Sequence, residues 1–181
     1  AHSLVVDTLL RCTISEANAR HVADALVDAE LVGQSGHGLR RVPSYAGQAL
    51  SGKVDGHAEP SIERTRPGAI AVDARHGFAY PAIRLAEDAL EPIAREHGLA
   101  MAGIRRSHHA GVTGLIAERI AARGLVGLVL VNSPPAIAPW GGRTPLFGTN
   151  PIAFAVPVEG DDPIVIDLSL SEVARGRIMA A

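Results

Sequence analysis

The sequence predicts an α/β (α+β) protein in which a helical part precedes a part built from alternating strands and helices. Apolar residues in the first fifty positions recur at the spacing of amphipathic helices, and from residue 69 onward short apolar runs alternate with helical patterns. A stretch rich in Gly, Pro and charge separates the two patterns and is typical of a linker. We therefore expect a helical domain over residues 1–66 and a second domain over residues 67–181.

Three helices are expected in the first part. The first spans residues 2–11. The second begins near Thr13 and Glu16, whose spacing is that of a capping box, and it ends at a glycine-rich turn over residues 33–38. The third begins near Pro43, because proline suits the first turn of a helix, and runs to about residue 50.

The second part is expected to alternate between strands and helices. Strands are predicted at 61–64, 69–72, 99–104, 125–131, 152–156 and 164–168, of which 99–104 and 125–131 are apolar enough to be buried. Helices are predicted at 81–97, at 112–123 and from 169–171 onward, with a long Pro/Gly loop over 133–151. Pro92 is expected to kink the first of these helices or to restart it.

Composition argues against several kinds of partner. Net charge is −2 and aromatic residues make up 3% of the chain, so neither a basic field nor a stacking platform for nucleic acid is expected. The longest apolar run, residues 125–131, is too short to span a bilayer. Cys12 is the single cysteine, which fits a reducing cytoplasm. We expect a cytoplasmic protein with no nucleic-acid or membrane partner.

A first polar cluster surrounds His37, which has a glycine on each side. Arg41 and Tyr45 follow four residues apart and would share one helix face. An imidazole near a guanidinium suits a 2-oxo acid, because Arg can bind the carboxylate through two hydrogen bonds and His can exchange a proton with the neighbouring oxygen. The alternative is a turn histidine and a surface arginine.

A second cluster, Ser107 to Gly111, lies between a predicted strand and a predicted helix. Such loops are where α/β proteins place active sites. The backbone N–H groups of Gly111, Val112 and Thr113 would face an anion at the helix start. Neighbouring histidines seldom point at one ion, and no ligand-spaced partner accompanies His108 and His109, so no metal is expected. A histidine that caps a turn is the alternative.

A third cluster consists of small polar residues that follow strand ends. They could hydrogen-bond an amide, a ribose or a phosphate, although Asn-Pro and Gly-Gly pairs are also ordinary turn formers. The residues are Asn132, Ser133, Gly141, Gly142, Thr149, Asn150, Asp167, Leu168, Ser169 and Ser171. The sequence contains no G-x-G-x-x-G turn, no P-loop, no C-x-x-C and no G-x-S-x-G elbow, so a dinucleotide would not bind a standard Rossmann turn.

Five motifs in order resemble the malate/L-lactate dehydrogenase family that is unrelated to the Rossmann-fold lactate dehydrogenases. They are G-H-G-L-R-R-V-P-S-Y from Gly36, S-H-H-A-G from Ser107, A-P-W-G-G from Ala138, G-T-N-P from Gly148 and D-L-S-L-S-E-V-A-R-G from Asp167. The family includes ureidoglycolate dehydrogenase, diketogulonate reductase, sulfolactate dehydrogenase and cyclic-imine carboxylate reductases. The resemblance implies a helical domain, a nicotinamide-binding domain with a largely antiparallel sheet, NAD or NADP as cofactor, and a homodimer of chains about twice as long.

The resemblance also implies roles for individual residues. His109 matches a proposed general acid/base, His37 matches a proton donor of the imine reductases, and Arg41 matches the arginine that holds the substrate carboxylate. Thr149 matches a substrate contact. Tyr45 and Asn150, which lie in the same motifs as Arg41 and Thr149, are also expected to contact substrate. The cofactor is expected at Gly111, Val112, Thr113, Ser133, Asp167, Leu168, Ser169 and Ser171. The family commonly has Ser-His-Gly where this chain has Gly36-His37-Gly38, which shifts the preference for proton donor to His109.

The sequence therefore predicts an oxidoreductase that transfers a hydride between NAD(P)H and a 2-oxo acid or its 2-hydroxy partner. The chain stops about ten residues into its last predicted helix, so we expect a truncated chain, and a non-catalytic fragment of such an enzyme is the first alternative. A metal-dependent hydrolase using His108 or His109 is the second. Arg175 or Arg177 could bind a 2′-phosphate, yet both could equally be ordinary surface charges, so NADH and NADPH are not distinguished.

Overall fold

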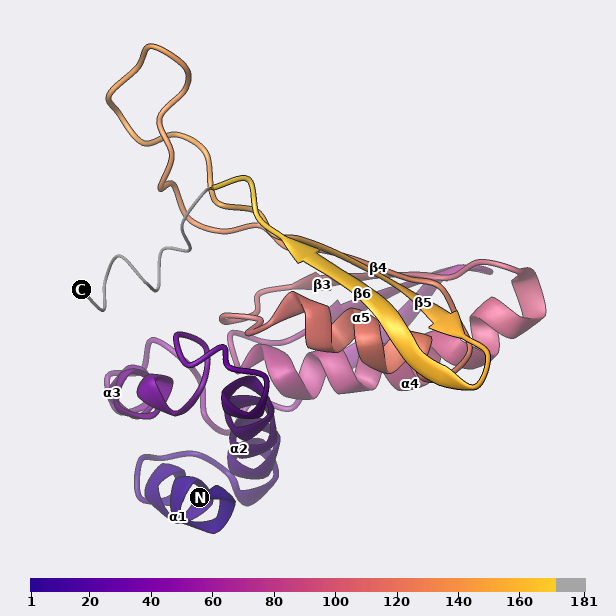
Figure 1. Cartoon of the computed structure of the whole chain (residues 1–181). Coiled ribbons are helices and arrows are strands. Elements are labelled where there is room, and N and C mark those ends of the chain that lie inside the picture. Colours follow the sequence, from indigo (N-terminus) through magenta and orange to yellow (C-terminus); the bar gives the residue numbers. More distant parts are fainter. Residues whose placement is uncertain (172–181) are drawn as a thin grey trace. The chain divides into compact units, whose positions relative to one another are not determined.

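The computed structural model describes residues 1–171 and is shown in Figure 1. By its internal contacts the chain divides into two compact units, Ala1–Gly111 and Val112–Ala181. Each unit has its own three-stranded sheet, and the two sheets share no strand. The units are described one at a time below.

The first unit begins with helices that pack around one apolar core. They are α1 (His2–Leu10), α2 (Glu16–Leu31), the short 3-10 helix η1 (Leu39–Arg41) and α3 (Val42–Leu50). Leu9, Val22, Leu26, Tyr45 and Phe78 are the large side chains that fill this core. The predicted helices are confirmed, including Pro43 in the first turn of α3.

The predicted capping box at Thr13 and Glu16 is wrong. Ser15 caps α2, and its hydroxyl accepts a hydrogen bond from the backbone N–H of Asn18 at 3.3 Å. Thr13 instead lies in a left-handed turn with φ of 57°, and its hydroxyl donates to the carbonyl of Cys12. The helix therefore starts two residues later than the Thr13 cap would place it.

The sheet of the first unit contains β1 (Ser61–Arg66), β2 (Ala69–Asp73) and β3 (Met101–Arg105), and α4 (Ala79–His97) packs on it. β1 pairs antiparallel with β2, and β2 pairs parallel with β3. Pro92 does not restart the helix, because α4 continues through Pro92 to a left-handed Gly98. The alternative, a kink at Pro92, stays a prediction. β3 is also less buried than predicted: it is an edge strand with alternate residues exposed.

The second unit consists of one helix and one antiparallel sheet over the residues that the structure describes. The helix is α5 (Thr113–Ala121), and the strands are β4 (Gly127–Leu130), β5 (Ile152–Val158) and β6 (Asp161–Leu168). Ala117 and Ala121 of α5 pack against Ala153 and Ala155 of β5, so one sheet face is closed. The other face is exposed at Leu128 and its neighbours, which corrects the prediction that this strand is buried.

The predicted fold class is confirmed, since helices combine with two sheets in which three of the four strand pairings are antiparallel. The domain boundary at residues 66 and 67 stays a prediction; β1 and β2 pair across it, and the two compact units meet at residues 111 and 112. Most of the helix predicted from residue 169, with Arg175 and Arg177, lies outside the described residues. Within residues 1–171, no helix has the length and apolarity needed to cross a membrane.

Candidate active site

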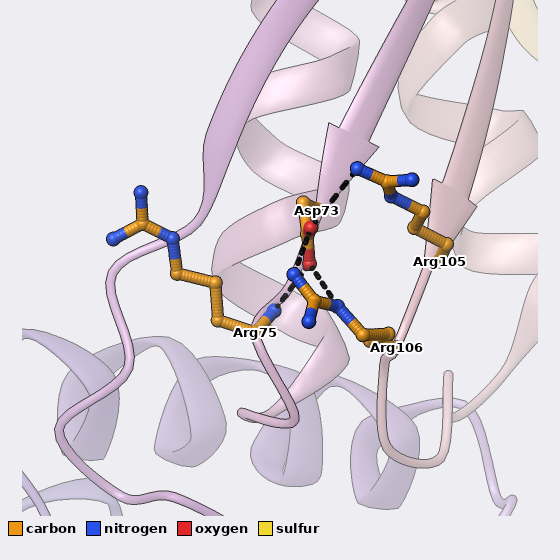
Figure 2. A network of polar contacts seen from close by, with 4 residues as sticks. All are labelled: Asp73, Arg75, Arg105 and Arg106. Atoms are coloured by element: carbon orange, nitrogen blue, oxygen red, sulfur yellow. Dashed lines mark hydrogen bonds and ion pairs between the residues drawn. The ribbon is translucent and has the colours of Figure 1, made fainter.

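The loop that carries His108 and His109 follows β3 and is held at its start by Asp73. The Asp73 carboxylate forms ion pairs with Arg105 and Arg106 and accepts the backbone N–H of Arg75, as Figure 2 shows. Arg106 is left-handed with φ of 51°, so the chain turns sharply at this residue. This turn directs the following residues from the strand end toward α3 and α4.

Backbone hydrogen bonds extend this attachment along the loop. The N–H groups of Ala74 and His76 donate to the carbonyls of Arg105 and Arg106, and the N–H of His108 donates to the carbonyl of Gly77. The loop is therefore held to residues 73–77 by an ion pair and by a ladder of backbone bonds. Residues held in this way can place a side chain reproducibly.

His109 lies in a cluster of aromatic side chains from distant parts of the first unit. Its ring stacks on that of His37, with centroids 5.1 Å apart and planes 6° from parallel. Its Nδ1 lies 2.8 Å from the hydroxyl of Tyr45 and 3.3 Å from the backbone nitrogen of Gly111. Tyr45 in turn lies 3.0 Å from the hydroxyl of Tyr80. The structure thus brings both predicted histidines into one cluster with Tyr45, His109 by direct contact and His37 through its stacking on His109.

Burial keeps the imidazole of His109 neutral. Desolvation, with smaller contributions from the charges of His37 and Arg41, lowers the pKa of His109 to about 3. This value is far below the neutral range on which the sequence argument relied. At physiological pH the ring therefore has one proton, and a chemical role must use the neutral form.

His108 faces a different partner and has a similar charge state. Its Nε2 lies 2.8 Å from Oε1 of Gln48, which only accepts, so Nε2 donates. Desolvation, with the charges of Lys53 and Arg41, lowers the pKa of His108 to about 4. Its Nδ1 is buried without a hydrogen-bond partner in the described structure. His108 packs edge-on against Tyr45 and so supports the cluster.

Arg41 supplies the positive charge of this cluster. Its Nε donates to the carbonyl of Gly36 at 2.7 Å, which ties the guanidinium to the turn that carries His37. The charge is near enough to lower the pKa of His108 and His109 and to oppose the rise in the pKa of Tyr45. An arginine and an uncharged histidine in one cluster can serve an anionic substrate that accepts a proton.

Asp167 of the second unit caps the start of α5. Its carboxylate accepts the hydroxyl of Thr113 at 2.8 Å and the backbone N–H of Gly114 at 2.7 Å. A Cβ at Gly114 would lie 2.9 Å from a carboxylate oxygen of Asp167, so a larger residue here would displace the carboxylate. The negative charge that a helix start attracts is thus supplied by the chain itself.

A second polar group of the second unit joins residues of two predicted motifs. The N–H of Ser133 donates to Oδ1 of Asn150 at 2.9 Å, and the hydroxyls of Ser133 and Thr149 lie 3.0 Å apart. Ser169 bonds locally to Ser171, and Leu168, the last residue of β6, is half exposed. Sequence motifs 16 residues apart are therefore brought together, and their hydroxyl and amide groups suit a ribose or an amide.

Sequence reasoning missed two members of the cluster in the first unit, Tyr80 and Gln48. Tyr80 lies 35 residues from Tyr45 and belongs to no recognised motif. The one available signal is the scarcity of tyrosine, because the chain has 2 and both are buried. Within residues 1–171, no group of three His, Cys, Asp or Glu side chains is arranged to hold a metal ion.

Comparison with known proteins gives a consistent result. The malate/L-lactate dehydrogenase family model matches residues 1–181. The chain is 50% identical to the (2R)-3-sulfolactate dehydrogenase (NADP(+)) of Chromohalobacter salexigens, with 100% of this chain and 54% of that protein aligned. It is 41% identical to a Delta(1)-pyrroline-2-carboxylate/Delta(1)-piperideine-2-carboxylate reductase of Pseudomonas syringae pv. tomato, over 98% of this chain and 53% of that protein.

Solved structures agree with these relatives. The structure resembles the delta1-piperideine-2-carboxylate reductase of Pseudomonas syringae with a TM-score of 0.94 at 39% identity, covering 99% of this chain and 54% of that one. It resembles the sulfolactate dehydrogenase of Methanocaldococcus jannaschii with a TM-score of 0.90 at 28% identity, covering 99% of this chain and 52% of that one. The chain spans about half the length of the curated relatives it matches. With its full-length match to the family model, the chain belongs to the malate/L-lactate dehydrogenase family.

Proposed function

We propose that this protein takes part in nicotinamide-dependent hydride transfer between a 2-oxo acid and its 2-hydroxy partner, and that the cluster around His109 handles the substrate. The observation that carries the proposal is the joining of Arg41, His37, Tyr45 and His109 in one cluster. Arg41 binds the substrate carboxylate, and His109 gives a proton to the oxygen on the neighbouring carbon. A bound nicotinamide supplies the hydride.

The second unit supports cofactor binding through neutral donors. Ser133, Asn150 and Thr149 present the hydroxyl and amide groups that suit a ribose or a carboxamide. Thr149 and Asn150 are equally the predicted substrate contacts. Gly111, Val112 and Thr113 stay predicted cofactor contacts, although a phosphate there would share the start of α5 with the carboxylate of Asp167.

NADP is the favoured cofactor, because the 50% identical relative is named as using it. A homodimer is proposed from the family resemblance.

A cyclic 2-imino acid is the second candidate substrate. Relatives 41% and 42% identical to this chain are named as pyrroline-2-carboxylate and piperideine-2-carboxylate reductases. Both substrate classes have a carboxylate next to the carbon that accepts hydride, so Arg41 serves either. The 2-oxo acid is preferred because the more similar relative is named as a sulfolactate dehydrogenase, and because this chain has Gly36 where the family resemblance implies a serine before the histidine.

The test is an assay of the complete gene product with NADPH and NADH against a panel of 2-oxo acids and cyclic imines. We expect oxidation of NADPH with a sulfonated or dicarboxylic 2-oxo acid. His109→Ala is expected to lower kcat by about a hundredfold or more, the usual range for a lost general acid. Arg41→Ala is expected mainly to raise KM, since it removes a contact to the carboxylate of the bound substrate.

Two results would count against the proposal. If the fluorescence of NADPH and NADH shows no saturable binding of either cofactor, the result would support a non-catalytic chain. Unchanged turnover in His109→Ala would remove His109 from the proton transfer, and His37→Ala assayed beside it would show whether the other ring serves instead. His57→Ala, an exposed histidine of the same unit, is the matched control and is expected to retain activity.

A further inference from the structure

The hydrogen bonds around His109 have a direction that one backbone group determines. The N–H of Gly111 can only donate, and it points at Nδ1 of His109 from 3.3 Å. Nδ1 is therefore an acceptor, and the single proton of the neutral ring lies on Nε2. The Tyr45 hydroxyl, 2.8 Å from Nδ1, must then donate to the same nitrogen.

The same reasoning extends to Tyr80. Because Tyr45 uses its proton on His109, its oxygen can only accept from the second hydroxyl, 3.0 Å away. We propose that Tyr80, Tyr45 and His109 form one directed hydrogen-bond chain, which holds His109 with its proton on Nε2 and delivers a proton to Nδ1 when Nε2 gives its own to the substrate. Tyr45 and Tyr80 are thus positioning and relay residues behind His109.

Packing shows that this chain of hydroxyls is built into the fold. Tyr45 is 1% exposed and Tyr80 7% exposed, so water does not replace either partner easily. Gly111 is left-handed with φ of 77°, and a Cβ there would lie 3.0 Å from both the ring and the hydroxyl of Tyr80. A glycine at this position therefore both directs its N–H to His109 and leaves room for Tyr80.

The relay answers a chemical difficulty of a neutral histidine. If a neutral imidazole lost the Nε2 proton with nothing in return, a strongly basic imidazolate would remain. In the relay, the Nε2–H bond breaks as an O–H bond forms on the substrate, and the Tyr45 proton moves to Nδ1. Tyr80 then passes its proton to Tyr45. The negative charge moves from the substrate oxygen to the Tyr80 oxygen. After the product leaves, Nε2 takes a proton from water, which leaves hydroxide, and the chain reverses: Nδ1 returns its proton to Tyr45, and Tyr45 returns one to Tyr80.

Charge in the cluster is consistent with this assignment. Burial raises the pKa of Tyr80 to about 12 and raises that of Tyr45 well above its usual range, so both are protonated donors at neutral pH. The positive charge of Arg41 opposes both shifts. Arg41 therefore stabilises the negative charge for the short time that it lies on Tyr80.

The first experiment needs no turnover, so it separates this inference from the proposed function on which it rests. Nitrogen-15 NMR of histidine-labelled protein reports which ring nitrogen carries the proton. At pH 7 we expect His109 to show a protonated Nε2 and an unprotonated Nδ1. Tyr45→Phe keeps the aromatic ring but removes the hydroxyl that donates to Nδ1. The chemical shift of Nδ1 is therefore expected to move toward that of a less strongly hydrogen-bonded nitrogen. A protonated Nδ1 in the unaltered protein would overturn the proposal.

The second experiment tests whether Tyr80 acts through His109. Tyr80→Phe is expected to lower kcat about tenfold, the rate equivalent of one hydrogen bond, with KM unchanged. The same substitution in a His109→Ala background is expected to have no further effect on kcat, because the group it serves is gone. Thr8→Val, which removes a hydroxyl from α1, is the control and should leave kcat unchanged both in the unaltered protein and in the His109→Ala background.

Two kinetic outcomes overturn the relay. Equal kcat for Tyr80→Phe and the unaltered protein, with a normal melting temperature, would show that Tyr80 passes no proton. Losses from Tyr80→Phe and His109→Ala that multiply in the double variant would show that Tyr80 acts on folding or on another group. Should Tyr80→Phe fold poorly, Tyr45→Phe is taken through the same cycle.

Discussion

At the scale of single residues, the charge state of His109 dominates what the cluster can do. The ring stacks on His37, accepts a hydrogen bond from Tyr45 and lies near Arg41. Each neighbour therefore either excludes water from the ring or disfavours a positive charge on it. A neutral ring is compatible with a neighbouring arginine that is proposed to bind the substrate, because the two groups do not repel each other. The consequence is that protonation of this buried base in acid destabilises the folded protein.

The pH dependence of stability follows from this burial. The unfolded chain protonates His109 near pH 6.5, whereas the folded chain does so near pH 3, so the free energy of unfolding falls as pH drops through this window. Between pH 7.5 and pH 5 the loss from His109 is about 2 kcal/mol at most. Urea unfolding at both pH values should show a smaller loss for His109→Gln, whereas His57→Gln should behave as the unaltered protein. An equal loss in His109→Gln would exclude His109 as its source.

The residues that sequence reasoning identified are those with local patterns. His37 between two glycines and Arg41 four residues before Tyr45 are readable from a single stretch, and the structure joins them to His109. Tyr80 cannot be identified from the sequence, because its place in the cluster depends on a partner 35 residues away and no sequence spacing indicates that contact. The neutral state of His109 is equally hidden, since it depends on burial by segments distant in the chain.

At the scale of elements, the turn between β2 and α4 positions the loop that carries His108 and His109. Asp73 ends β2, and its carboxylate holds Arg105 and Arg106 of the neighbouring strand end (Figure 2). Hydrogen bonding by Arg106, with that of the Arg75 N–H, holds the pKa of Asp73 below its usual range. Parallel pairing of β2 and β3 brings these strand ends to the same edge of the sheet.

Asp73→Asn is expected to loosen this turn. The amide cannot replace the charge that holds Arg106, so hydrogen exchange at the N–H groups of Ala74 and His76 should become faster. Because the pKa of Asp73 is lowered on folding, its contribution to stability is complete above about pH 4 and is lost as pH falls below that value. The stability difference from the unaltered protein should therefore shrink in acid. Asp7→Asn, in α1, should leave these exchange rates unchanged; an unchanged rate in Asp73→Asn would contradict the account.

Element boundaries that depend on distant contacts escaped prediction. Thr13 has the right spacing for a cap, yet the N–H of Ser15 bonds to the carbonyl of Gly56, and a Cβ at Gly56 would lie 2.3 Å from the Thr13 carbonyl. This packing selects Ser15 as the cap. Strand positions were predicted well, but the exposure of β3 follows from its place at a sheet edge, which no local pattern encodes.

At the scale of the whole molecule, the sheet of the second unit has one apolar face that the described residues leave exposed. Antiparallel pairing places side chains of β4, β5 and β6 in rows on this face, and Leu128, Phe154 and Ile166 form one such row. They are 62%, 38% and 50% exposed. A row of exposed apolar side chains on one sheet face is typical of a surface that another segment or chain covers.

The 181-residue chain is therefore expected to bind a hydrophobic dye such as ANS. Ile166→Lys should reduce the fluorescence with little loss of stability, because the side chain is already half exposed. Ala155→Lys, on the opposite face of the neighbouring strand, should cost roughly 3 kcal/mol or more, because it places a charge in a closed core. Absence of dye binding by the unaltered chain would show that the face is covered in solution.

The composition of the chain makes the hydroxyl pair unusually easy to observe. The chain has 2 tyrosines, and both belong to the chain of hydrogen bonds that ends on His109, while its single tryptophan, Trp140, is fully exposed. Ultraviolet absorbance of phenolate during an alkaline titration thus reports on this pair and on no other phenol. A ligand bound beside Arg41 would shift the pH at which these two phenols ionise, and this shift can be followed without any label or engineered probe.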